Sequence, residues 1–455
     1  MATRFLKFLS LLLILTLTWA PHAHAESLRF IRDAEIEDYL RDLGRPIFKA
    51  AGLDPQAVSL MIIQDSAINA FVAGGMNIFF YTGLLQSTET PDQLQGVIAH
   101  ETGHIAGGHL IRGQEAMGNA SAEAIIGMLA GLAIGVASGN AQVGMGALSG
   151  AQTIAERSFM SFSRAQEASA DAAAMRFLDK ANVSAQGLLE FMQKLAGQEL
   201  LPTESQAEYV RTHPLSQDRV DTIKHHIEET AFLSGHHLDD SYKSRHRRMK
   251  AKLLGFLQPE AALLRYTDKD PRLDARYARA IALYRTSQLP RAIALMDSLL
   301  ANEPANPYFL ELKAQILFEN SRIAEAVDLY QQAVARAPDS ALIRVAYAHA
   351  ILENKDSTQL DLAINQLLEA NRLEARSPET WRFLAAAWSR KGETDKDVKY
   401  QGLTSYALAE EALAKGQNKL AGRFADRALK TLKKGSPYWL RAQDIKLSVN
   451  ENTKD

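Results

Sequence analysis

The sequence predicts two folded units: a mostly helical α+β unit with a small β-sheet, followed by an all-α solenoid of short repeats. Three observations support this prediction. The chain has 455 residues, which is too long for one ordinary domain. Residues 26 to about 240 mix helix-like and strand-like patterns, whereas the chain from about residue 270 onward has helical periodicity and repeats itself. We place the boundary after residue 265, so that the two units cover residues 26–265 and 266–455.

The first 25 residues have the layout of a secretory signal peptide. Arg4 and Lys7 precede the apolar run Phe8–Trp19, and Ala23-His24-Ala25 matches the A-x-A cleavage pattern. The apolar run is short for the roughly 20 residues that a membrane-spanning helix needs. We therefore expect cleavage after about Ala25 and a mature chain in the periplasm.

A helix and a small sheet are expected at the start of the first unit. Apolar residues recur at steps of three and four within residues 29–51, where Pro46 is a candidate kink. Strand-like runs follow at Val58–Ile63 and Ile78–Tyr81. Gly74-Gly75 lies in the middle of residues 69–83, which is typical of a hairpin with a glycine turn. Helical patterning resumes at about residue 92.

The second unit carries a repeat of 34 residues. The segments Arg291–Leu295 and Glu325–Leu329 align at this offset, and Pro304 and Pro338 share it. A third copy, Leu362–Gln366, lies 37 residues beyond the second. Small residues where helices cross, with a proline at the exit, are the signature of tetratricopeptide repeats at this period.

The charge pattern argues against nucleic-acid binding, and it leaves the role of one basic segment undecided. The chain has 51 basic and 53 acidic residues, a formal net charge of −2, which argues against a general nucleic-acid binder. A basic run lies near the boundary between the units, at Lys243, Arg245, Arg247, Arg248, Lys250 and Lys252. It fits contact with an acidic partner or anionic lipid, but a solvated helix face is the simpler interpretation.

Residues 124–155 contain no charged residue, and glycine recurs at every fourth position from Gly127 to Gly139. The firmly apolar part ends near Ala137, so it is short for a membrane-spanning helix. We interpret this Gly/Ala-rich segment as a helical lid over a cleft, with contact to a membrane or an assembly partner as the alternative.

The chain has no cysteine, and its most informative motif uses histidine and glutamate instead. In His100-Glu101-Thr102-Gly103-His104 a helix places both histidines on one face, where both reach a metal ion at ~2.0–2.1 Å. Glu101 projects at another angle, where it can hold the attacking water and remove its proton. The motif therefore predicts a zinc metallopeptidase.

Two histidines leave a third protein ligand to be found. His109 lies five residues after His104, about 140° from the ligand face of a helix, and is expected to support the site rather than to bind metal. Glu167 and Asp171 share a helix face. Glu167 is the candidate ligand and Asp171 the candidate acceptor of an imidazole hydrogen bond, although spacing alone equally allows two solvated carboxylates.

Several segments follow one another as they do in the M48 family of zinc metallopeptidases. They are Asn69–Phe71, Gly74-Gly75, Tyr81–Leu84, His100–His104, Glu167–Asp171 and Thr212–Pro214. The first unit therefore resembles this family, which implies a zincin-type fold. The resemblance implies one Zn2+ per chain held by His100, His104 and Glu167, with Glu101 as catalytic base. With the repeats, it also implies degradation of unfolded or stalled outer-membrane β-barrel proteins and docking of the β-barrel assembly machinery on the repeats.

His213 has two open roles. Pro214 favours an extended or turn conformation for it. From a loop, its imidazole can stabilise the oxyanion of the reaction, or it can occupy the open zinc position and hold the enzyme inactive. Arg219 is a further candidate for charge stabilisation in the same site.

The strand at Ile78–Tyr81 is expected to bind extended substrate at its edge by β-augmentation, through Ile78, Phe79 and Phe80. Strand-forming clients suit this mode. The alternative function is a chaperone or scaffold for outer-membrane protein assembly whose protease site is normally inactive. The expected partners are envelope proteins and no nucleic acid, with peripheral membrane contact left open.

Overall fold

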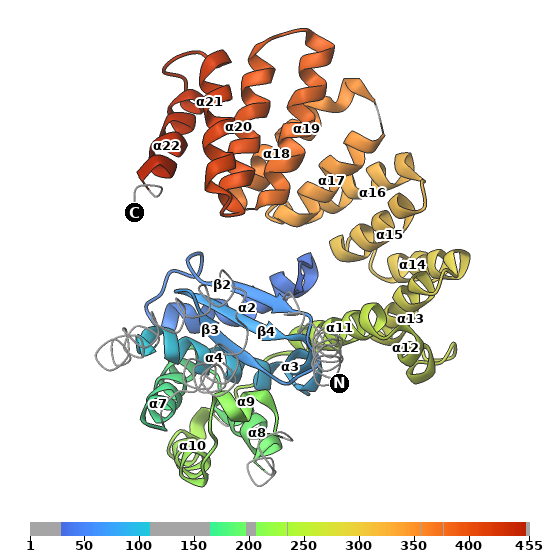
Figure 1. Cartoon of the computed structure of the whole chain (residues 1–455). Coiled ribbons are helices and arrows are strands. Elements are labelled where there is room, and N and C mark those ends of the chain that lie inside the picture. The colour runs from blue at the N-terminus through green and yellow to red at the C-terminus, as the bar shows by residue number, and fades with distance from the viewer. Residues whose placement is uncertain are drawn as a thin grey trace, which may run out of the picture.

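The computed structural model describes residues 29–109, 164–196, 206–233, 235–354, 356–375 and 377–451. The predicted signal peptide (1–25) and the predicted lid (124–155) lie outside these residues. The fold-class prediction is confirmed: helices and one four-stranded sheet come first, and a stack of helices follows (Figure 1). In the parts of the chain that the structure describes, no helix combines the length and apolarity that crossing a membrane requires.

The elements of the α+β part are, in chain order, β1 (Phe30–Ile31), α2 (Ala34–Ala50), β2 (Ser59–Ile63), β3 (Ala70–Ala73), β4 (Asn77–Tyr81), α3 (Thr82–Ser87), α4 (Pro91–Ala106), α7 (Arg164–Lys180), α8 (Gln186–Leu195), α9 (Glu208–Thr212), α10 (Gln217–Glu229), the 3-10 helix η3 (Ala231–Leu233), α11 (Asp240–Leu257) and α12 (Pro259–Arg265). The predicted helix over residues 29–51 begins later than expected, because Phe30 and Ile31 pair with β2 and Asp33 caps α2. Pro46 lies inside α2 without ending it.

The sheet has the order β1-β2-β4-β3, with β2 and β4 parallel and the other pairs antiparallel. The predicted hairpin is confirmed: β3 and β4 pair with Phe71 opposite Phe79, and the connection contains Gly74 and Gly75 at φ of 60° and 98°. These positive values are the left-handed region that glycine adopts without strain.

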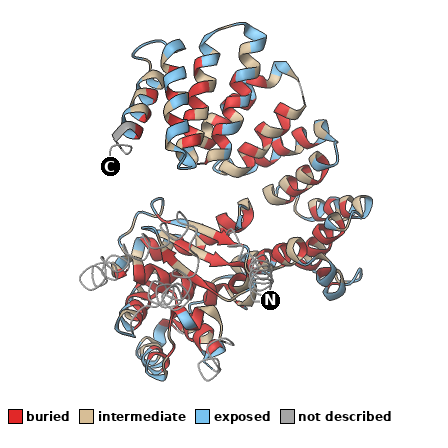
Figure 2. Cartoon of the chain, viewed as in Figure 1, coloured by how far each residue is buried: buried red, intermediate tan, exposed pale blue. Residues whose placement is uncertain are grey.

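The core of the α+β part lies between one face of the sheet and two helices. Ile62, Val72, Ile78 and Phe80 are buried there with apolar side chains of α2 and α4. Figure 2 colours the buried parts of the chain red. Because α4 carries the His100–His104 motif, this packing fixes the position of the motif relative to the sheet.

The repeat array consists of α13 (Leu273–Arg285), α14 (Leu289–Asn302), α15 (Pro307–Glu319), α16 (Ile323–Arg336), α17 (Ala341–Glu353), the 3-10 helix η4 (Ser357–Gln359), α18 (Leu360–Leu373), α19 (Pro378–Asp395), α20 (Lys399–Ala414), α21 (Asn418–Thr431) and α22 (Pro437–Glu451). The helices α13, α15 and α17 begin 34 residues apart, as the sequence predicts. The aligned alanines Ala292, Ala326 and Ala363 are fully buried, because only a small side chain fits where helices cross this closely.

The basic run on α11 is solvated only at Lys243 and Arg247, and the prediction of a solvated face is wrong for the rest of the run. Arg245 pairs with Asp38 and Asp42 of α2, and Lys252 Nζ lies 2.8 Å from Asp33 Oδ2 with its side chain 2% exposed. Glu35 accepts from Arg248 and from Tyr277 of the repeat array. We call Asp33, Glu35, Arg248, Lys252 and Tyr277 the joint cluster, because it connects α2, α11 and the first repeat helix.

Candidate metal and catalytic site

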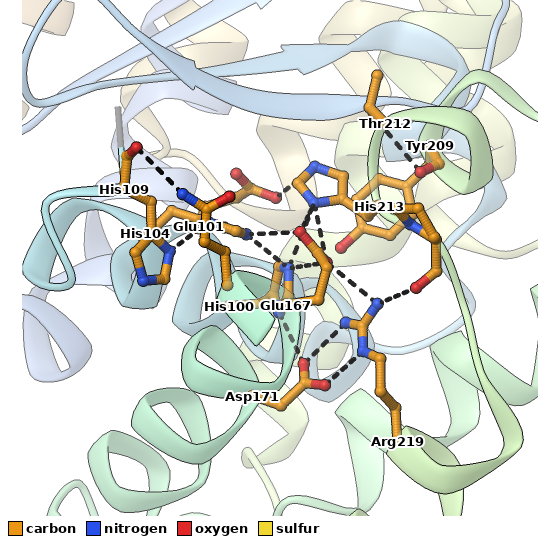
Figure 3. Close-up of polar contacts among 12 residues, drawn as sticks. His100, Glu101, His104, His109, Glu167, Asp171, Tyr209, Thr212, His213 and Arg219 are labelled. Carbon is orange, nitrogen blue, oxygen red and sulfur yellow. Dashed lines mark hydrogen bonds and ion pairs between the residues drawn. The ribbon is translucent and has the colours of Figure 1, made fainter. Parts of the chain in front are cut away.

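Helix α4 presents the two histidines of the motif to one point. Thr90 caps the helix and Pro91 occupies its first turn, so the helix begins well before the motif. Both imidazoles are fully buried, and His100 Nε2 lies 3.1 Å from His104 Nε2 (Figure 3).

Helix α7 brings Glu167 to the same point. Gly103 permits the approach, because a Cβ atom at this position would lie 2.6 Å from the carbonyl oxygen of Ala170. Glu167 Oε2 and Oε1 lie 3.4 Å from His100 Nε2 and His104 Nε2 respectively. The structure thus brings together the three residues that the sequence proposes as ligands.

His213 follows α9 and completes a group of four. Its Nδ1 atom lies 3.3 Å from Glu167 Oε1 and 3.4 Å from His100 Nε2. Its Nε2 atom is 3.2 Å from the carbonyl oxygen of Ala70 on β3. A carbonyl oxygen accepts only, so Nε2 carries the proton and Nδ1 offers its lone pair to the group.

These four residues, the metal cluster, are grouped closely enough to hold one cation. Their donor atoms all lie within 4.8 Å of one another. Bond lengths of ~2.0–2.1 Å place the corners of a tetrahedron roughly 3.3–3.4 Å apart, and the separations given above are 3.1–3.4 Å. Two histidines, a carboxylate and a third histidine are a donor set that suits Zn2+. The residues therefore fit the cation that the sequence predicts.

The far nitrogens of the α4 histidines also have partners. His100 Nδ1 lies 2.8 Å from Asp171 Oδ1, and His104 Nδ1 lies 2.9 Å from His109 Nδ1. Arg219 binds both oxygens of Asp171 and approaches Glu167 Oε2 at 3.0 Å. Such contacts fix the orientation of ligand side chains around a metal.

Burial and neighbouring charge shift the pKa values of the cluster. Burial alone would lower the pKa of His100, but its contacts with Asp171 and Glu167 outweigh burial and raise it to about 10. Burial lowers the pKa of His104 to about 3, helped by the charges of His100 and His213. Burial opposes ionisation of Glu167, yet His213, His100 and His104 hold its pKa well below the usual range. A cation that binds here must therefore displace the proton on His100.

Glu101 lies beside the cluster without joining it. Its side chain is fully buried, and neither carboxylate oxygen has a hydrogen-bond partner within the described part of the chain. Burial raises its pKa. Its Oε1 atom is 3.6 Å from His213 Nε2. A buried carboxylate without donors is costly, and this position suits a base that acts on a water at the cluster.

Tyr209 is a site residue that sequence reasoning missed. Its ring centroid lies 4.5 Å from that of His213, and Figure 3 draws the two rings beside each other. The side chain is fully buried, and its hydroxyl has no partner among the described residues. One signal was available: Tyr209 precedes His213 by four residues, which is the spacing of neighbours on a helix face.

The prediction that the Ile78–Tyr81 strand is a free edge is wrong. β4 is bonded to β2 on one side and to β3 on the other. Ile78 and Phe80 are fully buried in the core, so they cannot contact substrate. The edge strand beside the metal cluster is β3, through Ala70.

The fold and the site together define a metallopeptidase domain joined to an array of helical repeats. Residues 34–227 match the model of peptidase family M48, and residues 260–307 and 277–341 match a tetratricopeptide repeat model. The chain therefore contains a peptidase M48 domain followed by tetratricopeptide repeats.

Curated relatives align with this chain over different lengths. The chain is 26% identical over 377 residues to the "Beta-barrel assembly-enhancing protease" of Yersinia pestis, covering 81% of this chain and 75% of that one. It is 24% identical over 382 residues to the protein of that name from Escherichia coli (strain K12), covering 83% and 77%. The "Metalloprotease LoiP" of the same strain is 29% identical over 173 residues, covering 38% of this chain and 64% of that one.

Proposed function

We propose that the protein is a periplasmic zinc endopeptidase that degrades misassembled outer-membrane β-barrel proteins. The observation that carries the enzymatic part is the close grouping of four metal-donor side chains beside a buried carboxylate that has no hydrogen-bond partner among the described residues. The names of the relatives support the connection to barrel assembly. The periplasmic location rests on the predicted signal peptide and on these names.

The proposed chemistry assigns one task to each residue. A bound Zn2+ would supply Lewis acidity toward a peptide carbonyl and a water. His100, His104 and Glu167 hold the cation. Glu101 takes the proton of the attacking water, and its raised pKa suits both acceptance and later donation to the leaving amine. Asp171 and Arg219 hold His100 and Glu167 in position.

In this proposal the structure corresponds to a resting state. A catalytic zinc site needs an open fourth position, and a cation held by His100, His104 and Glu167 would have His213 at that position. His213 must therefore withdraw before substrate binds. Its bond to Ala70 also covers the edge of β3, where an extended substrate would pair.

The Glu101→Gln variant tests the assignment. It should bind zinc like the wild type, measured by atomic absorption, because Glu101 is not a ligand. Its turnover of an unfolded barrel protein should fall by about 100-fold or more, since general-base catalysis contributes ~10²–10⁴. A Glu89→Gln variant, changed at a side chain 67% exposed, is the matched control and should cleave normally. Degradation at the wild-type rate by Glu101→Gln would contradict the mechanism.

A chaperone or scaffold with an inactive protease site is the second candidate. The placement of His213 at the fourth position favours it, because a closed site does not turn over. The same Glu101→Gln protein distinguishes the two functions: retained suppression of client aggregation, with cleavage lost, would show that both activities reside in this chain.

A further inference from the structure

The apolar core packs against one face of the sheet, and on the opposite face Ile63 and Tyr81 are also buried. Ala70 and Val72 of β3 and Ile78 and Phe80 of β4 are buried against the helices. Side chains alternate along a strand, so Phe71 and Phe79 project from the opposite face. In the described ranges, neither ring belongs to a hydrophobic core cluster. In the view of Figure 1 the strands lie on the side of the peptidase domain that is nearer the repeat array.

Three rings form a row across this second face. Phe71 stacks on Phe79 with centroids 4.9 Å apart and an interplanar angle of 13°. Phe79 contacts Phe30 of β1 at 6.4 Å, and Phe30 is 48% exposed. We call these residues the aromatic row. A sheet face away from the core is normally polar, and a contiguous apolar patch marks a binding surface.

The aromatic row ends at the edge strand beside the metal cluster. Tyr81 N–H donates to Asn69 C=O, so hydrogen-bonded pairs fall on alternate residues from Asn69. Phe71 therefore points its backbone groups toward β4, while Ala70 and Val72 point theirs outward. Ala70 C=O is the acceptor of the His213 contact, so a strand added at this edge passes the metal cluster directly.

We infer that the aromatic row selects the client, and that the substrate class is an extended segment with bulky apolar side chains at alternate positions. This inference rests on the proposed function and specifies its substrate. A strand paired with β3 places every second side chain on the face of Phe71. The residue opposite Phe71 forms a non-hydrogen-bonded pair, in which the side chains of an antiparallel ladder approach most closely.

The other positions of the client face the helices. There the inward neighbours on β3 are Ala70 and Val72, and α4 with the metal cluster lies on that side of the sheet. Bulky apolar side chains of the client therefore contribute to binding only on the face that meets the aromatic row. The geometry selects a strand with one apolar face over a segment that is apolar throughout.

Two fluorescent peptides of identical composition test this selectivity. One alternates large apolar with polar residues, and the other holds the same apolar residues in one block. Binding is measured by anisotropy to full-length, zinc-loaded Glu101→Gln protein, so that no cleavage intervenes. The alternating peptide should bind more tightly, and Phe71→Thr in that background should weaken its binding roughly two- to fivefold, the effect of one or two cross-strand pairs.

Two further variants separate recognition from folding. Phe71→Leu keeps apolar bulk and should retain most of the preference. Phe232→Thr removes an aromatic ring that is 76% exposed on η3, and it should change nothing. Equal binding of both peptides, or unchanged binding by Phe71→Thr with an unaltered Tm, would overturn the inference.

Lipid is the competing occupant, and the same variants address it. Phe71-dependent binding to vesicles of phosphatidylethanolamine and phosphatidylglycerol, without any peptide preference, would assign the aromatic row to a membrane surface and overturn the client assignment. If the wild type hydrolyses neither peptide but Glu101→Gln protein shows the preference, the catalytic proposal fails while the assignment of the aromatic row stands.

Discussion

The protein holds two clusters of buried charge, and they differ in how completely their members are paired. In the joint cluster, the Lys252 ammonium contacts Asp33 and Glu35, and the Glu35 oxygens accept from Arg248 and Tyr277. Beside the metal cluster, the Glu101 carboxylate and the hydroxyl of Tyr209 have no hydrogen-bond partner within the described residues. The metal cluster is fully buried, whereas the side chains of Asp33 and Arg248 in the joint cluster remain 16% and 11% exposed.

The difference distinguishes a structural network from a functional one. Buried polar groups are nearly always satisfied, because an unmet donor or acceptor forfeits its hydration without compensation. The joint cluster follows this rule and connects α2, α11 and α13. Two groups beside the metal cluster depart from it: the Glu101 carboxylate, which is the proposed base, and the hydroxyl of Tyr209. Such unsatisfied groups are expected at functional sites, where a side chain binds a substrate or water only during part of the reaction cycle.

The largest expected effect lies in the joint cluster. Lys252→Met removes the cation between Asp33 and Glu35, so that within the described residues Asp33 loses its ion-pair partner and Glu35 keeps only Arg248. We expect a loss of about 3–5 kcal/mol in the free energy of unfolding, measured by urea titration. Lys243→Met, at a side chain 47% exposed on the same helix, should change stability by less than about 0.5 kcal/mol. A mild effect at Lys252 would mean that the cluster tolerates unpaired charge and would weaken the comparison.

A pH titration should show a second large effect. His246 Nε2–H donates to the carbonyl oxygen of Thr88, and its Nδ1 accepts from the Tyr39 hydroxyl. Burial, with Lys250 and Arg247 nearby, lowers its pKa from 6.5 to about 4. Between pH 6.5 and 4, His246 is therefore protonated in the unfolded chain but neutral in the folded chain. Stability should fall over this window as pH decreases, by up to about 3 kcal/mol. His246→Gln should flatten this part of the pH profile of Tm, and an unchanged slope would exclude His246 as its source.

At the metal cluster, Asp171→Asn should act through the imidazole that it orients. The amide retains an acceptor for His100 but loses the charge that pairs with Arg219. Loss of such a partner weakens metal affinity by about 10–100-fold. A competition titration with a chelator measures this directly. Asp179→Asn, on the same helix but paired with His226, is the control and should bind zinc normally.

The smallest effect compares two buried tyrosines. Tyr39→Phe removes a hydroxyl that contacts His246 and should cost about 1 kcal/mol. Tyr209→Phe removes a hydroxyl without a partner among the described residues, so the variant should be as stable as the wild type or more stable. Thermal unfolding of both variants tests whether the Tyr39 hydroxyl is hydrogen-bonded and the Tyr209 hydroxyl is not. Destabilisation of Tyr209→Phe by the same amount as Tyr39→Phe would show that its hydroxyl is in fact bonded.

Much of the fold follows from local pattern. The repeat helices recur where the 34-residue offset predicts, because each repeat carries its own small residues and contacts its neighbours. The spacing of His100 and His104 predicts their convergence for a similar reason, since one helix turn separates them. The spacing of Glu167 and Asp171 predicts a shared face, but it does not say which helix that face meets.

The misses concern contacts between distant segments. β4 was expected at an edge, but β2 pairs with it in parallel, and nothing local to residues 77–81 encodes that neighbour. The basic run was interpreted as solvated because its acidic partners on α2 lie some 200 residues earlier in the chain. Tyr209 carried only the weak signal of its spacing from His213.

Gly103 has a consequence for how the cation site is assembled. Here the backbones of α4 and α7 touch, with no side chain between them that can adjust their separation. The distance from the motif histidines to Glu167 is therefore set by contact between the two main chains. A site prepared in this way reorganises little when its ion arrives, so most of the coordination energy is available as affinity.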